Sequence, residues 1–179
     1  DKLLVSWNAL MIQGLARAAR IFGRRDWLVA ATAAVDAIRD GLWVEGRLLA
    51  TSRAGKAHLN AYLDDHSLLI SALIELMQSH FRPVDLAFAE DLADALLDDF
   101  EDRGRGGFFF TRHDHEALIH RPRSAHDGAM PSGNGVAAQA LGRLGHMTGE
   151  TRYLDAAERT LQAFYTALRQ SPSGYASLA

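Results

Sequence analysis

The side chains best suited to proton transfer in this sequence are three aspartates. Asp64 and Asp65 are adjacent and stand directly before an apolar stripe with helical spacing, and Asp127 comes shortly before a second such stripe. Two carboxylates that face each other across a cleft can act as general acid and general base, which is what cleavage of a glycosidic bond requires. We therefore take Asp65 and Asp127 as candidate catalytic residues. A carboxylate at a helix start also caps backbone N–H groups, and that structural role stays open for all three.

Asp64 and Asp65 are expected to point in different directions, because successive residues of a helix are turned by about 100°. Asp64 stands immediately ahead of the apolar stripe, so we assign it the capping role, with contacts to ligand hydroxyl groups as its second role. Asp65 is then the carboxylate expected to face a pocket. On this assignment Asp64→Ala lowers the stability more than Asp65→Ala does.

Residues that suit ligand binding stand at the starts of two helical segments. The amides of Asn8 and Asn134 can hold loop carbonyls in place or bond ligand hydroxyl groups, and both readings stay open. An indole such as that of Trp7 can stack on a sugar ring or fill a core. The candidate substrate-binding residues are Trp7, Asn8, Asp64, His126, Ser132 and Asn134.

Histidines are concentrated on the segments between the predicted helices and at the start of one of them. Six of the eight fall there: His58, His66, His113, His115, His120 and His126. Because imidazole exchanges protons near neutral pH, we add His66 to the catalytic candidates, with His126 as its alternative. The pair His113 and His115 lacks a recognisable third ligand and is a weak metal signal, so neither a metal nor another cofactor is expected.

An internal repeat determines how these residues are positioned. The segment from Ser6 to Ala31 returns 126 residues later as Ser132 to Ala157, with nine of 26 aligned positions identical. Unrelated segments would share about two. Asn8 aligns with Asn134, and Arg17 aligns with Arg143. Each copy has the pattern of a helix, a short turn and a second helix, which is typical of stacked helical hairpins.

Helical periodicity predicts three such hairpins, over residues 6–40, 63–101 and 132–169. Gly23 is expected to end the first helix and Asp26 to cap the second. A small β-hairpin is predicted over residues 42–50 with a turn at Glu45 and Gly46, and a strand over 108–111. The helices that start near residues 6, 64 and 132 should form an inner layer. The fold class is therefore all-α: about half of an (α/α)₆ toroid, with small β-hairpins at one rim.

Composition excludes several function classes. The net charge is −3 and no basic run is present, which argues against nucleic acid as the main partner. Without cysteine there is no thiolate nucleophile or thiolate metal site. No apolar run reaches the roughly 20 residues that span a bilayer and no signal peptide opens the chain, so we expect no membrane partner and a cytoplasmic location. The start at Asp1, close to a motif, is typical of a piece of a longer protein.

Four ordered motifs resemble the C-terminal region of the thioredoxin-domain-containing, spermatogenesis-associated-like family. They are SWNAL from Ser6, YLDDH from Tyr62, GGFFFT from Gly106 and DGAMPSGN from Asp127. The resemblance implies an (α/α)₆ barrel of the six-hairpin glycosidase kind, similar to N-acylglucosamine 2-epimerase and cellobiose 2-epimerase. The thioredoxin-like domain that the resemblance places upstream is not within these residues.

Two functions remain open from the sequence. The first is a carbohydrate-active barrel, epimerase-like or glycosidase-like, that takes a small carbohydrate ligand. The second is a non-catalytic binding or scaffold module attached to a thioredoxin-like domain. Convergent carboxylates and a histidine in one pocket favour the enzyme, whereas carboxylates used up as caps favour the scaffold. Half a toroid leaves an apolar edge uncovered, so we also expect this fragment to self-associate.

Overall fold

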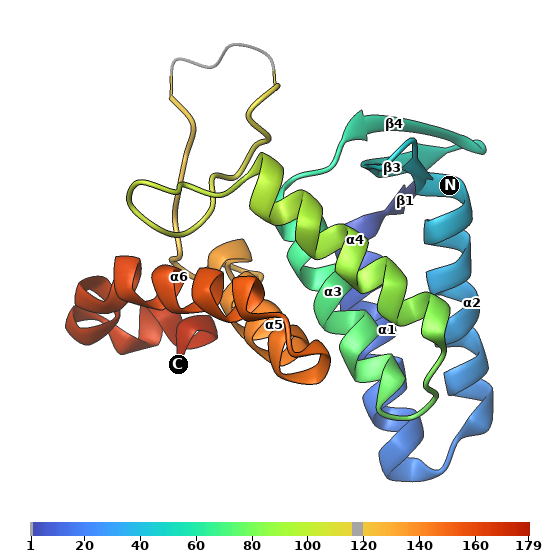
Figure 1. The fold of residues 1–179 in the computed structure, drawn as a ribbon. Helices are drawn as coiled ribbons and strands as arrows, with labels where there is room; N and C mark the ends of the chain where they lie inside the picture. Colours follow the sequence, from blue (N-terminus) through green and yellow to red (C-terminus); the bar gives the residue numbers. More distant parts are fainter. Residues whose placement is uncertain (1, 116–119) are drawn as a thin grey trace.

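The fold is a row of three helical hairpins with a small sheet at one end (Figure 1). The computed structural model describes residues 2–115 and 120–179. The helices are α1 (Val5–Phe22), α2 (Arg25–Leu42), α3 (Leu63–Met77), α4 (Pro83–Asp99), α5 (Gly133–Thr148) and α6 (Thr151–Gln170). The strands are β1 (Lys2–Leu4), β2 (Trp43–Val44), β3 (Arg47–Arg53) and β4 (Lys56–Asn60), and a short 3₁₀ segment, η1 (Pro172–Leu178), closes the chain.

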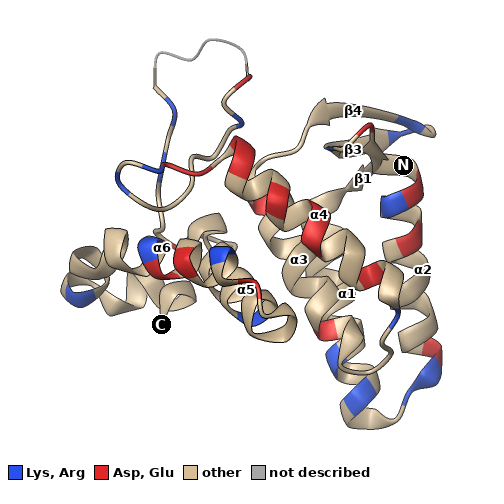
Figure 2. Ribbon diagram, viewed as in Figure 1, with Lys and Arg blue, Asp and Glu red and all other residues tan. Residues whose placement is uncertain are grey.

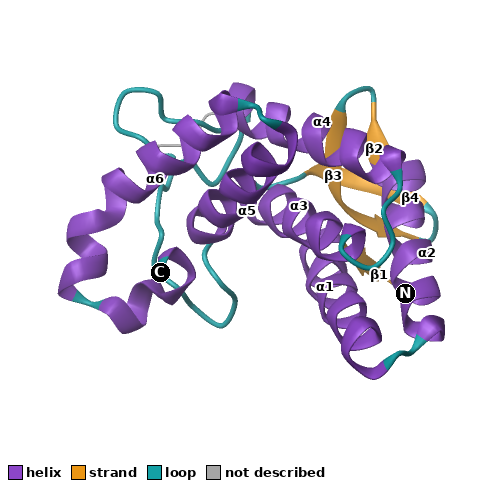
Figure 3. Ribbon diagram, turned by 60° about the horizontal axis from the view of Figure 1, so that its bottom comes forward, coloured by secondary structure: helices purple, strands orange, loops and turns teal. Residues whose placement is uncertain are grey.

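The first helix of each hairpin lies in an inner layer, as predicted. Helix α3 packs between α1 and α5, while α2, α4 and α6 each pack mainly against the preceding helix in the chain. Figure 3 shows α1, α3 and α5 as a row, with the other three helices along its outer side. Each inner helix therefore has one side toward its outer partner and an opposite side away from the outer layer.

The middle inner helix is buried almost completely. Thirteen of the fifteen residues of α3 are buried, and the two exceptions are Asp64 and Ser71. Seven residues correspond to two turns of a helix to within about 20°, so these two exceptions share one face. Further along the same face come Glu75 and Gln78. We call these four residues the open face of α3.

Helix ends follow the expected signals in some places and not in others. Gly23 and Gly149 end α1 and α5 in the left-handed conformation, and the Ser132 hydroxyl caps α5 by accepting from the Gly135 N–H. The prediction that Asp26 caps α2 is wrong, because the cap position belongs to Arg24. Asp26 lies within the first turn and forms an ion pair with the Arg24 side chain.

The sheet is larger than the sequence predicts. The expected hairpin is present, with Trp43 paired to Leu48 around the Glu45–Gly46 turn, where both residues have positive φ. A second tight turn joins β3 to β4, and β1 pairs with the other edge of β3. The sheet therefore connects the start of α1 to the segment that leads into α3.

The strand predicted over 108–111 is wrong. Phe108 forms one isolated bridge with Glu101. Both backbone groups of Phe108 are bonded instead by the Asn134 side chain, whose Oδ1 accepts at 2.7 Å and whose Nδ2 donates at 2.9 Å. A side-chain amide thus takes the place of a partner strand, and the segment remains a loop fixed to α5.

No helix in the described parts of the chain is both long enough and apolar enough to cross a membrane.

Candidate functional site

The first turns of the three inner helices meet at one end of the layer, and two aspartates of α3 join them. The Asp65 carboxylate bonds the start of α1 and the Asp64 carboxylate faces the start of α5. Most of the polar residues singled out in the sequence therefore come together here. Their individual environments differ widely, and these differences decide which of them is available for chemistry.

Asp65 caps α3 and is fully engaged. One carboxylate oxygen accepts from the Tyr62 N–H and the other from the Ser6 N–H, each at 3.0 Å. Burial raises the pKa of Asp65, and hydrogen bonds from Tyr62 and Ser6 partly offset this rise. The assignment of the cap to Asp64 and of the pocket-facing role to Asp65 is therefore wrong. The helix begins at Leu63, as the bounds of the second hairpin predict, but it is Asp65, the third residue of the helix, whose carboxylate reaches back to the cap position at Tyr62.

Asp64 is the available carboxylate. Burial, followed by repulsion from Asp65, raises its pKa to about 6, and hydrogen bonding by the Gly133 N–H lowers it only in part. The fit against α5 is tight, since a Cβ on Gly133 would lie 2.3 Å from Asp64 Oδ1. Asp64 is thus a half-buried acid on the open face of α3, with a pKa suited to giving or taking a proton near neutral pH.

Asp127 ties the start of α5 to the end of the chain. Its carboxylate accepts from the Ser132 N–H at 2.8 Å, the Ser177 N–H at 2.9 Å and the Ser177 hydroxyl at 2.5 Å. Burial by itself would raise the pKa of Asp127, but these hydrogen bonds outweigh it and bring the pKa below the usual range. Asp127 is therefore an ionised carboxylate close to the first turn of α5.

The two repeat-related asparagines have structural partners. Asn134 is fully buried and uses its amide on Phe108 and on the Ser124 carbonyl. Asn8 donates to the Leu4 carbonyl at 2.8 Å and is half-buried. Asn134 therefore has the structural role of holding loop backbone groups in place. Asn8 is the member of the pair that still reaches the surface.

Trp7 lies on an uncovered edge of α1 and not in the core. It is 64% exposed, and Met11, one turn further along, is 62% exposed. Gly14, Ala18 and Ile21 continue the same edge at helical spacing. We call these five residues the α1 edge.

Neither histidine candidate lies on the open face. His66 is buried against Phe100, its Nδ1 bonds the Tyr62 carbonyl, and burial lowers its pKa to about 4. Two residues of helix turn it by about 200° from Asp64, toward the other side of α3. The expectation that His66 transfers a proton at this site is therefore dropped. His126 is exposed and contacts the Tyr175 ring edge-on.

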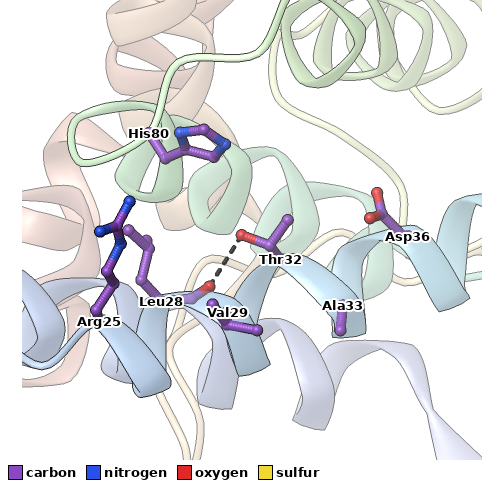
Figure 4. Close-up of a pocket in the computed structure, with 7 residues that line it drawn as sticks. All are labelled: Arg25, Leu28, Val29, Thr32, Ala33, Asp36 and His80. Carbon is purple, nitrogen blue, oxygen red and sulfur yellow. Dashed lines mark hydrogen bonds between the residues drawn. The ribbon is translucent and has the colours of Figure 1, made fainter.

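Surface cavities lie beside this region and away from it. A cavity of about 460 Å³ at the rim is lined by Leu59, Asn60, Tyr62, Asp114 and His115. The sequence analysis named Tyr62 only as the start of a motif and His115 only as part of a weak metal pair; it did not predict that they lie together, because the loop that brings His115 to Tyr62 has no helical pattern. A second cavity, of about 390 Å³, lies on the outer layer between α2 and His80 (Figure 4). Six of its seven lining residues belong to α2, so this cavity is separate from Asp64, Asp65 and Asp127.

Within the described residues, no group of three or more His, Cys, Asp or Glu side chains is arranged to hold a metal ion.

Comparison with known sequences agrees with the family resemblance. No protein-family model matches the chain. Human spermatogenesis-associated protein 20 is 29% identical over 183 residues, and the rat protein of the same name is 28% identical. These matches include 96% of this chain but only 23% of the relatives. The chain is thus a distant homologue of one part of those proteins.

Comparison with solved structures shows the fold. A GH76 alpha-mannanase from Bacteroides thetaiotaomicron matches with a TM-score of 0.76 at 12% identity, over 93% of this chain and 45% of that one. The cellobiose 2-epimerase of Spirochaeta thermophila matches with a TM-score of 0.75 at 18% identity, over 96% and 45%. The predicted fold class is therefore confirmed: the chain corresponds to about half of a six-hairpin barrel.

Proposed function

We propose that this chain supplies one part of a carbohydrate-active barrel in which Asp64 transfers a proton. The observation that carries the proposal is the environment of Asp64, a half-buried carboxylate with a pKa of about 6 on the open face of the middle inner helix. Around neutral pH such a group is found in both protonation states, so it can protonate a leaving oxygen or accept a proton. The chemical class is glycoside cleavage or epimerisation next to a carbonyl.

A second carboxylate with the opposite pKa shift supports this assignment. Asp64 faces the N–H of Gly133, and Asp127 accepts from the N–H of Ser132, the preceding residue. Burial raises the pKa of Asp64, whereas hydrogen bonds hold that of Asp127 down. Two carboxylates in one site whose environments push their pKa values apart are the usual arrangement for an acid and an ionised partner, and both of these lie at the start of α5. Asp127 would supply the negative charge that stabilises a cationic transition state.

A solved relative in the comparison adds a parallel. An inactive variant of the alpha-1,6-mannanase GH76A of Salegentibacter, in complex with alpha-1,6-mannotriose, has two consecutive aspartates replaced by asparagine; it matches this chain with a TM-score of 0.71 at 16% identity. This chain has two pairs of consecutive aspartates, Asp64–Asp65 and Asp98–Asp99. The second pair ends the outer helix α4. Asp64–Asp65, on an inner helix, is the pair that we assign to ligand binding, with a neutral saccharide as the ligand class.

The alternative is a saccharide-binding or scaffold module without catalysis. The observation that favours it is the engagement of Asp65, Asp127 and Asn134 in hydrogen bonds, mostly to backbone groups. On this reading the three residues only hold the first turns of the helices together, and Asp64 is a ligand for hydroxyl groups.

Turnover by an Asp64→Asn variant separates the two functions. The full chain is incubated with a panel of mono- and disaccharides, including mannobiose and cellobiose, and products are followed by chromatography. Asp64→Asn keeps the size of the side chain and removes the titrating group, and Asp98→Asn on α4 is the matched control. The enzyme proposal expects turnover that only Asp64→Asn abolishes. Saccharide binding with no product from any of the three proteins would establish the binding module instead.

A further inference from the structure

The open face of α3 carries a second cluster of charges, at the opposite end from Asp64. Glu75 is 2% exposed and lies eleven residues after Asp64, which places it on the same face and about 16 Å further along the helix. Three arginines surround its carboxylate. Arg20 donates to Oε1 at 2.8 Å, while Arg17 and Arg143 approach Oε2 at 3.4 and 3.8 Å.

The arginines come from both neighbouring helices. Arg17 and Arg20 belong to α1 and Arg143 to α5, so the two helices reach Glu75 from either side. Arg17 and Arg143 occupy equivalent positions in the two copies of the internal repeat. The repeat thereby places the same side chain on both sides of the middle helix and directs both at one carboxylate oxygen. Figure 2 shows basic residues in blue toward the lower end of α1.

The charges of this cluster do not balance. Three guanidinium groups face one carboxylate, and within the described chain none of the three forms an ion pair with any other acid. Their side chains are 60%, 40% and 41% exposed for Arg17, Arg20 and Arg143, whereas Glu75 is buried beneath them. Two positive charges are therefore left over on an accessible surface. A phosphate monoester carries about −1.5 to −2 charges near neutral pH, and guanidinium groups bond its oxygens in pairs.

We propose that Arg17, Arg20 and Arg143 bind the phosphate group of a phosphorylated saccharide on the open face of α3. Glu75 holds the three side chains in place from below, Gln78 accepts a further bond from Arg20, and the outward N–H groups of Arg17 and Arg143 are left for the ligand. The saccharide part of the ligand rests on the proposed function, because it takes the same face as the carbohydrate surface. The phosphate part rests on the arginine cluster alone.

Binding of four probes to the full chain, mannose 6-phosphate, inorganic phosphate, mannose and the carboxylate sugar glucuronate, tests the ligand class. Titration calorimetry at low ionic strength with mannose 6-phosphate, inorganic phosphate and mannose is expected to give the tightest binding for the sugar phosphate, weaker binding for phosphate and the weakest for mannose. Added salt should weaken the first two. No binding of either phosphate compound, or glucuronate binding as tightly as mannose 6-phosphate, would overturn the proposal.

Arginine variants locate the site. Arg17→Gln and Arg143→Gln should each weaken phosphate binding about tenfold or more, as expected for the loss of a charge-assisted hydrogen bond. Arg53→Gln, which removes the same charge from the exposed end of β3, should leave it unchanged. Equal losses in all three variants would show that only the overall charge matters, and the site would be abandoned.

Glu75→Gln separates a ligand site from a set of ion pairs that only join helices. It keeps the shape of the side chain and removes the competing negative charge, so the phosphate affinity should rise. If the arginines serve only to hold α1 and α5 against α3, the same variant lowers the melting temperature without tightening phosphate binding. Should Glu75→Gln fail to fold, the two arginine variants still decide.

The proposal and the function of Asp64 fail in different ways. Asp64→Asn should abolish saccharide turnover and leave the affinity for inorganic phosphate unchanged, because the two groups lie about 16 Å apart along the helix. Arg143→Gln should weaken the binding of inorganic phosphate and leave the turnover of uncharged saccharides unchanged. Loss of phosphate binding in Asp64→Asn would contradict a separate arginine site.

Discussion

Asp64 and Asp127 lie against consecutive residues at the start of α5, Asp64 at Gly133, the first residue of the helix, and Asp127 at the N–H of the cap residue Ser132. Positions 64 and 127 are far apart in the chain, and both carboxylates reach the start of α5, Asp64 from α3, which packs beside α5, and Asp127 from the segment that leads into α5. The N-terminus of a helix favours negative charge, so α5 accommodates two carboxylates at once. One of them keeps its proton to a higher pH than the other, and this contrast yields the first prediction.

Asp64 should make the chain less stable as the pH rises from 4 to 6. Its pKa is raised from 3.8 to about 6, so within this window the folded chain retains a proton that the unfolded chain has released. The contribution of the protonated Asp64 to the free energy of unfolding is then fully present below the unfolded-state pKa of 3.8 and is lost as the pH rises through the folded-state pKa of about 6. The asparagine in Asp64→Asn does not titrate. At pH 7 the free energy of unfolding of this variant should therefore exceed that of the parent by on the order of 2 kcal/mol, a figure already reduced for the partial exposure of Asp64.

Denaturant melts of the parent and of Asp64→Asn at pH 4, 5, 6 and 7 measure this difference. Comparing two proteins at each pH removes the contributions of all other groups, His66 included. Asp98→Asn, on the exposed surface of α4, is the control and should give a smaller difference at pH 7. A difference that stays constant from pH 4 to 7 would contradict the raised pKa of Asp64.

Alanine substitutions should rank Asp65 above Asp64 in their cost to stability. Asp65→Ala leaves the N–H groups of Tyr62 and Ser6 without their partner, and the loss of such a cap costs about 1–3 kcal/mol. Asp64→Ala removes a carboxylate whose burial is already unfavourable, so it should cost less or stabilise the chain at pH 7. Thermal melts rank the two variants, and an equal or larger loss for Asp64→Ala would contradict the capping assignment.

Gly133→Ala should disturb Asp64 directly. A Cβ there would lie 2.3 Å from Asp64 Oδ1 and 2.7 Å from Leu63 Cγ, so α3 or α5 has to move, at a cost of about 1–3 kcal/mol. Gly142, on the same helix, is the matched control, because its Cβ would find only the Ala157 Cβ, at 3.9 Å. Gly142→Ala should stabilise the chain by about 0.5–1 kcal/mol. If both variants changed the free energy of unfolding in the same direction, Gly133 would not be a close contact of Asp64 and Leu63.

The α1 edge should drive self-association of the isolated chain. Trp7, Met11 and Ile21 are each more than 60% exposed along one side of α1, and the solved barrels that this chain resembles are about twice its length. We expect the apparent mass in sedimentation to rise with concentration, and the double variant Trp7→Lys, Met11→Lys to remain a monomer. Tyr165→Lys, on exposed α6, controls for added charge and should still associate. A parent that remains monomeric at high concentration would contradict this.

The hairpins could be predicted because their signal is local. The apolar spacing of α1, α3 and α5, the glycines that end α1 and α5, and the Ser132 cap all act within a few residues of each other. The strand at 108–111 could not be excluded in the same way. Its aromatic residues have strand propensity, but the backbone groups of Phe108 bond the side chain of Asn134, 26 positions away, and the Phe110 N–H bonds the Pro122 carbonyl, partners that no local pattern indicates.

The roles of Asp64 and Asp65 depended on which of the two carboxylates reaches back to the cap position of α3. The helix starts at Leu63, as predicted, but Asp65 accepts from the Tyr62 N–H, and its other oxygen accepts from Ser6, 59 residues away in the chain. The sequence therefore indicated which short segment carries the site but not which of its two carboxylates is free. The position of His115 beside Tyr62 was not predicted for a similar reason, since a loop has no periodicity from which its position could be read.

The linear stacking of the hairpins has a consequence for synthesis on the ribosome. Helix α3 has one inner neighbour made before it and one made after it, and its burial is complete only when α5 has arrived. Between these events a nascent chain carries α3 with one apolar side unprotected, for the time needed to make the roughly 60 residues up to the middle of α5, which is about 3–12 s at ordinary rates. Chaperones that recognise apolar helices would meet this chain in that interval.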